Sequence, residues 1–295
     1  MANRYWVGGT GNWNDTSHWT DSFVEMTGYI ARSVGTYENT LVIESITGTL
    51  TPGMTAYISM SDGSNGFRSI ADHNPLGTIS FTGTGTGGVG TYSHSLGTSL
   101  PDNYKNTPLR FTAHGATGAS VPTYTDDVFV LQTWPGTGSG YYYINTPPSA
   151  DGAFIHMKSL TANSAALVVA VVGGVPTSDP ANPNKANGEV YIYGSVNCPG
   201  AILGYGNWYL GSTTPSQTYT VSGRAVSGLY FKSLTIGHDR YDSTFSNCST
   251  CTWNFTGRVG FIPGFDEALT LTAGRIGVAS GATISPRQFL STSPI

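Results

Sequence analysis

The sequence contains few charged residues and no strong excess of one sign. Asp, Glu, Lys and Arg make up 10% of the 295 residues, and the net charge is −4 at pH 7. Soluble proteins usually carry about 25% charged residues. Nucleic-acid-binding proteins have a basic face or stripe, and anionic membranes attract basic segments. The composition therefore argues against both kinds of partner.

Long hydrophobic runs and a secretory leader are missing as well. The longest apolar run, Ala165–Val172, has eight residues, whereas a membrane-spanning helix needs about 20. The N-terminal residues include no apolar core of a signal peptide, so we expect neither membrane insertion nor export by that route. The 39% of hydrophobic residues are nevertheless enough to bury a core.

Cysteine is scarce, with three residues at positions 198, 248 and 251. An odd number without a leader argues against a disulfide framework. Cys248 and Cys251 have the C-x-x-C spacing of a metal-binding turn, but a structural zinc ion needs four ligands. The chain has no second pair of this kind. We therefore expect ordinary strand or turn cysteines, no metal ion and no cofactor.

Short stretches of alternating hydrophobic and polar residues, separated by Gly, Pro, Asn and Asp, fill the chain instead. This pattern predicts β-strands, and helix signals are almost absent. The predicted fold class is therefore all-β. The clearest strand patterns are Thr40–Ile46, Thr78–Thr82, Val128–Leu131, Glu189–Tyr193, Leu229–Ile236 and Ala268–Thr272.

Two similar segments suggest an irregular repeat. His156–Thr161 and Tyr230–Thr235 both contain the sequence Lys-Ser-Leu-Thr. The coils of a β-solenoid with loops of variable length would look like this. A β-sandwich with long loops is the competing architecture, and the pattern alone does not separate the two.

The N-terminal segment Tyr5–Trp19 contains the motif W-x-G-G-x-G-x-W and ends in a further His-Trp pair. It resembles the opening of phage virion proteins and of bacterial autotransporter-like β-helical adhesins. In the phage proteins a second segment follows that is similar to Gly118–Phe129 here, and Ile192–Val196 is similar to a later strand. The resemblance implies an irregular β-solenoid or β-helix-like domain.

The residues between these motifs carry a second resemblance, to a Gly/Thr-rich β module of phage tail proteins. It rests on Leu41–Ile43, Gly48–Leu50, Pro52–Met54 and Gly83–Tyr92. The resemblance implies that residues 25–106 form a small β-sandwich or β-barrel module. Surface loops tolerate such insertions, so the host would be a discontinuous solenoid-like domain of residues 1–24 plus 107–295.

Glycine and tryptophan gather in the N-terminal motif. Glycine permits positive φ and a sharp chain reversal, and indole rings cover a large apolar area. Because a solenoid needs a cover over its terminal rung, we expect a structural cap here, with a sugar-stacking platform as the alternative. The residues concerned are Trp6, Gly8, Gly9, Gly11, Trp13 and Trp19.

Three consecutive tyrosines, Tyr141, Tyr142 and Tyr143, form a possible interface. Tyrosine is enriched at protein interfaces because it combines rigid contact area with a hydroxyl group. The alternative is a sheet with one buried and one exposed aromatic face.

No arrangement of residues supports an enzyme. Asp126 and Asp127 are adjacent, as are Asp266 and Glu267, and neighbours on a strand point to opposite faces. The segment His238–Asp242 holds two carboxylates that a glycosidase could use, but we favour a polar loop. The motifs of serine hydrolases, P-loop proteins and zinc proteases are absent from the sequence.

The resemblance implies a non-enzymatic structural component of a bacteriophage virion, assembled in the host cytoplasm. We expect a tail-fibre or tailspike-like appendage that makes virion assembly contacts or attaches to the host surface. Its partners would be other virion proteins, a host-surface glycan or receptor, and further copies in a homotrimer, since multivalency strengthens weak contacts. The alternatives are a capsid decoration or head-fibre protein and a polysaccharide depolymerase on a β-helix scaffold.

Overall fold

The protein is described by a computed structural model in which strands account for nearly all regular structure. The predicted all-β class is confirmed, and the described part of the chain contains one short 3-10 helix, η1 (Thr16–His18). The structure describes residues 2–7, 10–32, 39–48, 54–60, 79–80, 90–94, 109–130, 141–146, 154–162, 169–174, 188–198, 202–223, 229–237, 248–262 and 268–291.

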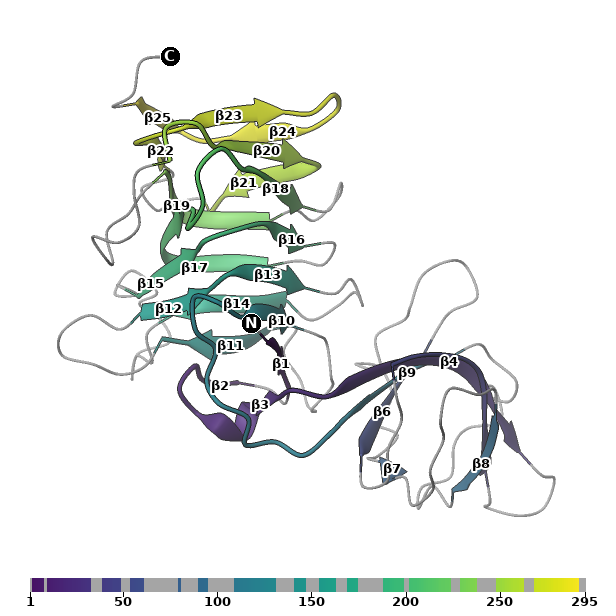
Figure 1. Ribbon diagram of the computed structural model, residues 1–295. Coiled ribbons are helices and arrows are strands. Elements are labelled where there is room, and N and C mark those ends of the chain that lie inside the picture. Colours follow the sequence, from purple (N-terminus) through teal and green to yellow (C-terminus); the bar gives the residue numbers. More distant parts are fainter. Residues whose placement is uncertain are drawn as a thin grey trace.

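Two large sheets, A and B, form a stack of mainly parallel strands (Figure 1). In sheet A the first strand pairs antiparallel with β3, and every other pair is parallel. The order in sheet A is β23 (Arg275–Val278), β20 (Thr252–Thr256), β18 (Thr218–Gly223), β16 (Val196–Cys198), β13 (Ser159–Ala162), β10 (Asp127–Val130), β1 (Asn3–Trp6) and β3 (Trp19–Thr20).

Sheet B contains two parallel ladders joined by two long strands, β17 (Ile202–Leu210) and β19 (Leu229–Ile236). The first half of each long strand belongs to one ladder and the second half to the other. The first ladder also holds β2 (Gly11–Asn12), β11 (Tyr141–Asn145), β14 (Val169–Gly174), β21 (Arg258–Phe261) and β24 (Thr283–Ser285). The second holds β12 (Phe154–Met157), β15 (Glu189–Ile192), β22 (Ala268–Leu271) and β25 (Gln288–Ser291).

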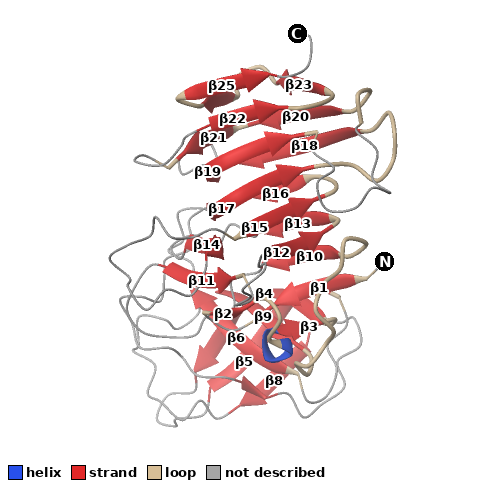
Figure 2. Ribbon diagram, turned by 90° about the vertical axis from the view of Figure 1, so that its left-hand side faces the viewer, coloured by secondary structure: helices blue, strands red, loops and turns tan. Residues whose placement is uncertain are grey.

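The chain passes through these ladders in a recurring order. From β10 onward it enters sheet A, then the first ladder of sheet B, then the second, and returns to sheet A. We call each such pass a rung. The N-terminal strands lie at one end of the stack and β23, β24 and β25 form the last rung at the other end (Figures 1 and 2).

The hydrophobic core lies between the sheets because alternate residues of each strand point inward. The strands β10, β12, β13 and β22 all show this alternation of buried and half-buried residues. Registered residues of successive rungs form columns. The sheet A column is Val128, Leu160, Val196, Val221, Phe255 and Val278. A column of sheet B is Ile155, Val190, Trp208, Leu234, Leu269 and Phe289.

A third sheet, C, is entirely antiparallel and lies beside the N-terminal end of the stack (Figure 1). Its strand order is β7 (Ile79–Ser80), β6 (Thr55–Met60), β9 (Leu109–His114), β4 (Phe23–Arg32), β5 (Asn39–Thr47) and β8 (Gly90–His94). The expected module of residues 25–106 leaves out β9, although β9 pairs with both β4 and β6. The strand that leaves the stack and the strand that returns to it therefore lie together in this sheet.

Candidate functional site

The three tryptophans of the N-terminal motif meet at one end of the stack. Trp6, Trp13 and Trp19 all belong to the main hydrophobic core and are at most 3% exposed. The ring of Trp19 lies edge-on to Trp6 and to Trp13, with centroid distances of 5.0 and 4.7 Å. Its Nε1 donates a hydrogen bond of 2.8 Å to the carbonyl oxygen of Trp13. Rings buried in this way leave no face on which a sugar could stack.

The glycine at position 11 serves this cluster through its small size. The expectation of a positive φ is wrong for Gly11, which lies in the extended strand β2. A side chain there would collide with the imidazole of His18, whose ring stacks on Trp6 at a centroid distance of 4.5 Å. Gly8 and Gly9 lie outside the described residues.

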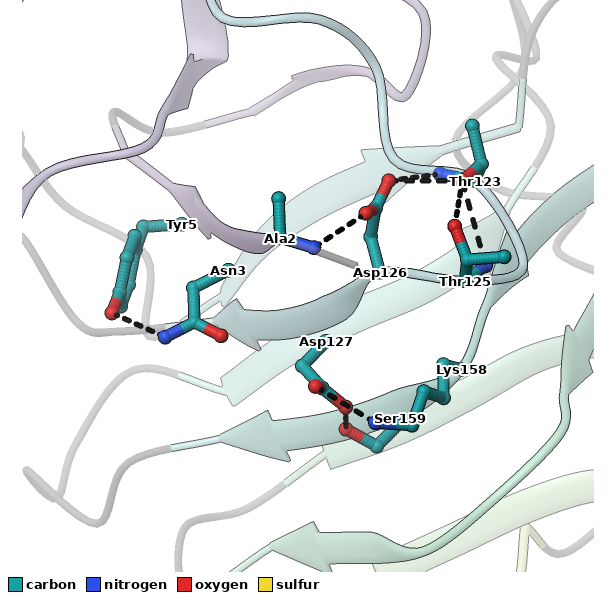
Figure 3. A network of polar contacts seen from close by, with 9 residues as sticks. All are labelled: Ala2, Asn3, Tyr5, Thr123, Thr125, Asp126, Asp127, Lys158 and Ser159. Atoms are coloured by element: carbon teal, nitrogen blue, oxygen red, sulfur yellow. Dashed lines mark hydrogen bonds and ion pairs between the residues drawn. The ribbon is translucent and has the colours of Figure 1, made fainter.

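Asp126 joins the N-terminal strand to the loop that precedes β10 (Figure 3). Its Oδ1 accepts a hydrogen bond of 2.9 Å from the backbone N–H of Ala2, and its Oδ2 accepts bonds from the N–H and the hydroxyl of Thr123. Burial opposes ionisation of this carboxyl group, but these hydrogen bonds outweigh it and hold the pKa of Asp126 below its usual range. The arrangement favours the ionised form of Asp126, whose carboxylate links Ala2 to Thr123.

The neighbouring carboxyl group has partners of its own. Asp127 accepts a hydrogen bond from the hydroxyl of Ser159, with which it is in register, and lies 3.1 Å from the Nζ of Lys158. Figure 3 shows the two aspartates bonded to different groups. The geometry therefore offers no substrate position shared by both carboxylates, as acid–base catalysis would require.

A stack of aromatic rings lies on sheet B, on the side away from the core columns. His156, Tyr191 and Tyr209 occupy registered positions of three successive strands. The centroid distances are 5.3 and 4.8 Å, and the hydroxyl of Tyr191 donates a bond of 2.6 Å to Glu189. Burial lowers the pKa of His156 to about 4. The sequence pattern does not reveal this group, because its members come from different rungs and the sequence does not give their register.

The C-terminal end of the stack exposes residues that belong to the core columns. Val278 and Phe289, the last members of their columns, are 55% and 49% exposed, and the adjacent Leu290 is 52% exposed. One rung earlier, Phe255 and Leu269 are 0% and 3% exposed. Among the described residues, no side chain covers this end of the core as the tryptophans cover the other.

Cys248 and Cys251 form a disulfide bond, which corrects the expectation of ordinary cysteines. The backbone N–H of Cys251 donates to the carbonyl oxygen of Cys248 in a tight turn, and their Cα atoms lie 5.2 Å apart. That separation suits a disulfide. Cys198 is a free, buried cysteine, and burial raises the pKa of its thiol to about 12. No group of three or more potential metal ligands occurs within the described ranges.

The remaining candidate residues lie partly or wholly outside the described part of the chain. Tyr141, Tyr142 and Tyr143 form the start of β11, in register with Val169–Val171 of β14, but their side chains are not described. The segment His238–Asp242 and the pair Asp266 and Glu267 fall outside the described residues. Their expected roles remain predictions.

No family model, curated relative or solved structure matches the chain. In the part of the chain that the structure describes, no helix has the length and apolar character needed to span a membrane.

Proposed function

We propose that the chain is a non-enzymatic structural component of a bacteriophage virion, part of a tail-fibre or tailspike-like appendage, and that its stack is a β-solenoid. The solenoid is supported by the rungs, which visit three ladders in the same order from β10 to β25. In a solenoid each repeat contacts only its neighbouring repeats, so the core needs a cover at each end. The virion assignment is supported by the phage-type motifs of the sequence.

The difference between the two ends of the stack carries this proposal. Tryptophans bury the core at the N-terminal end, whereas Val278, Phe289 and Leu290 are about half exposed at the other. The strands β23, β24 and β25 also have only one neighbour each among the described residues. Open strand edges and exposed apolar patches are typical sites of protein association. The exposed apolar side chains of the last described rung therefore favour contact with another protein surface.

Sheet C supports a second role, in contact with other surfaces. It lies beside the stack and is connected through β4 and β9 (Figure 1). The ring of Phe23 at the start of β4 stacks on Tyr5 of β1 at 5.3 Å, and Tyr5 stacks on Phe129 of β10 at 4.9 Å. These contacts hold the start of sheet C to the stack, which suits presentation of the sheet to another virion protein or to the host surface.

The presence of the chain in the particle is the first test of this proposal. Phage grown on its host and purified through a density gradient would be analysed by quantitative mass spectrometry. We expect peptides of this chain to co-sediment with infectious particles at several copies per virion. Recovery of the chain from infected cells but not from purified particles would contradict the proposal.

A further inference from the structure

An open hollow of about 400 Å³ lies near the C-terminal end of the stack. It is formed by the first ladder of sheet B, where β21 and β24 run side by side. Arg258 is in register with Thr283, and Gly260 with Ser285. Because Val259 points into the core, its neighbours Arg258 and Gly260 point outward. The lining residues are Gly257, Arg258, Gly281, Thr283 and Ser285.

Missing side chains create the space. Gly257 and Gly281 contribute only backbone to the lining, and a side chain at Gly281 would project into open space. Next to the hollow, the ring of Tyr230 lies so close to Gly260 that any larger residue at that position would collide with it. The hollow therefore combines glycine backbone, two hydroxyl groups and a guanidinium group, with an aromatic ring one strand away.

The charge of this region is entirely positive in the described residues. Residues 248–262 and 268–291 contain Arg258, Arg275 and Arg287 but no Asp or Glu. Arg258 forms no ion pair among the described parts of the chain. A guanidinium group that has no carboxylate partner among the described residues and that lies beside hydroxyl groups is suited to bind an anionic oxygen ligand.

We propose that this hollow binds a carboxylate-bearing sugar unit, such as the uronic acids of acidic polysaccharides. The guanidinium of Arg258 would pair with the carboxylate, and the hydroxyls of Thr283 and Ser285 would exchange hydrogen bonds with sugar hydroxyls. None of the described lining residues has an apolar side chain, which favours a hydroxyl-rich sugar over an acidic peptide. The inference rests on the proposed function, since it gives host-surface attachment a ligand class.

The test is a calorimetric titration of the full chain with trigalacturonic acid, with a neutral galactose trisaccharide as the matched ligand. We expect binding of the acidic sugar only. Arg258→Gln should weaken it about tenfold or more, because a charge-assisted contact is lost. Arg275→Gln removes the same charge from sheet A, outside the hollow, and should leave the affinity within about twofold. Ser285→Ala provides a second, milder probe of the hollow, and thermal melting confirms that each variant is folded.

Three results would overturn the inference. The first is the absence of binding by the wild-type chain at millimolar sugar. The second is an equal loss in Arg258→Gln and Arg275→Gln, which would indicate diffuse charge attraction. The third is equally tight binding of a polyglutamate peptide, which would assign the hollow to acidic peptides. The assay uses the isolated protein, so its outcome is independent of whether the chain is found in virions.

Discussion

At the residue scale, the carboxyl group of Asp126 holds the N-terminal strand against the loop before β10. The backbone N–H groups of Ala2 and Thr123 each donate to one carboxylate oxygen of Asp126. Asp126→Asn would replace one of these oxygens with an amide N–H₂, which cannot accept a hydrogen bond. A hydrogen bond to a charged group contributes about 1.5–3 kcal/mol, and because the bonds from Ala2 and Thr123 are only partly buried, the loss should be about 1–2 kcal/mol. We expect a loss of this size in the free energy of unfolding, measured by urea denaturation at pH 7.

The pH dependence of the free energy of unfolding provides a second test of the same variant. The pKa of Asp126 is lower in the folded protein than its usual value, so its stabilising effect is complete above the usual carboxyl range. It is lost as the pH falls through the folded-state pKa. The gap between wild type and Asp126→Asn should narrow in acid. The exposed Asp21 is the matched control, and Asp21→Asn should change stability by less than about 0.5 kcal/mol.

The buried imidazole of His156 predicts a separate pH effect. Burial lowers its pKa from 6.5 to about 4, so the unfolded chain binds this proton more readily than the folded one. Stability should therefore fall as the pH decreases from 6.5 to 4. His156→Phe keeps a ring beside Tyr191 and removes the titration. Thermal melts across this window should show a weaker pH dependence in the variant, and an unchanged slope would contradict the assignment.

Single residues also show where sequence reasoning stops. The contact between Trp6, Trp13 and Trp19 was predictable because the three residues lie within one short segment, whereas the extended backbone of Gly11 was not. The disulfide between Cys248 and Cys251 was not predicted, because an odd cysteine count says nothing about a local turn. The role of Arg258 depends on which strand lies beside β21, and no sequence spacing reveals that pairing.

At the scale of elements, the turns between β20 and β21 and between β23 and β24 provide a matched pair of glycines. Gly257 and Gly281 have φ values of 79° and 80°. An added Cβ would meet the carbonyl oxygen of Gly223 at the first position and nothing at the second. Gly281→Ala should cost about 1–2 kcal/mol from the left-handed backbone alone. Gly257→Ala should cost about 1–3 kcal/mol more, as chemical denaturation would show; equal losses would contradict this geometry.

The last two members of one core column test whether the end of the stack is open. Leu269 is buried and Phe289, in register with it, is half exposed. Leu269→Ala should lower the free energy of unfolding by about 2–5 kcal/mol. Phe289→Ala should lower it by about 1 kcal/mol or less, because an exposed side chain loses little burial. Both would be measured at a concentration that keeps the chain monomeric, and similar losses would mean that the end is covered.

Individual strands follow from the sequence, but their partners do not. The strand expected at Leu229–Ile236 coincides with β19, because its residues alternate between buried and half-buried positions, with one break at Lys232. The segments that share Lys-Ser-Leu-Thr occupy unlike positions. His156–Thr161 runs from β12 into β13, whereas Tyr230–Thr235 lies within β19. Because the loops differ in length, the rungs have no constant sequence period. Similar sequence segments therefore do not occupy equivalent positions in the rungs.

At the scale of the whole molecule, the open end predicts association of copies. We expect light scattering to give a trimer of the 31.0 kDa chain at micromolar concentration. Phe289→Asp and Leu290→Asp should reduce the mass toward that of one chain, since a charge opposes burial of this end. Tyr124→Asp alters another exposed side chain, away from the last rung, and should leave the mass unchanged. A wild-type mass of one chain would contradict the trimer.

The position of the chain on the virus particle decides whether it is a tail component. Cryo-electron microscopy of purified virions, combined with immunogold labelling by an antibody to this chain, would locate it. We expect density and label at the tail or its fibres. Regular density on the capsid would instead favour a decoration or head-fibre protein. Absence of the chain from the particle would contradict the assignment to the virion.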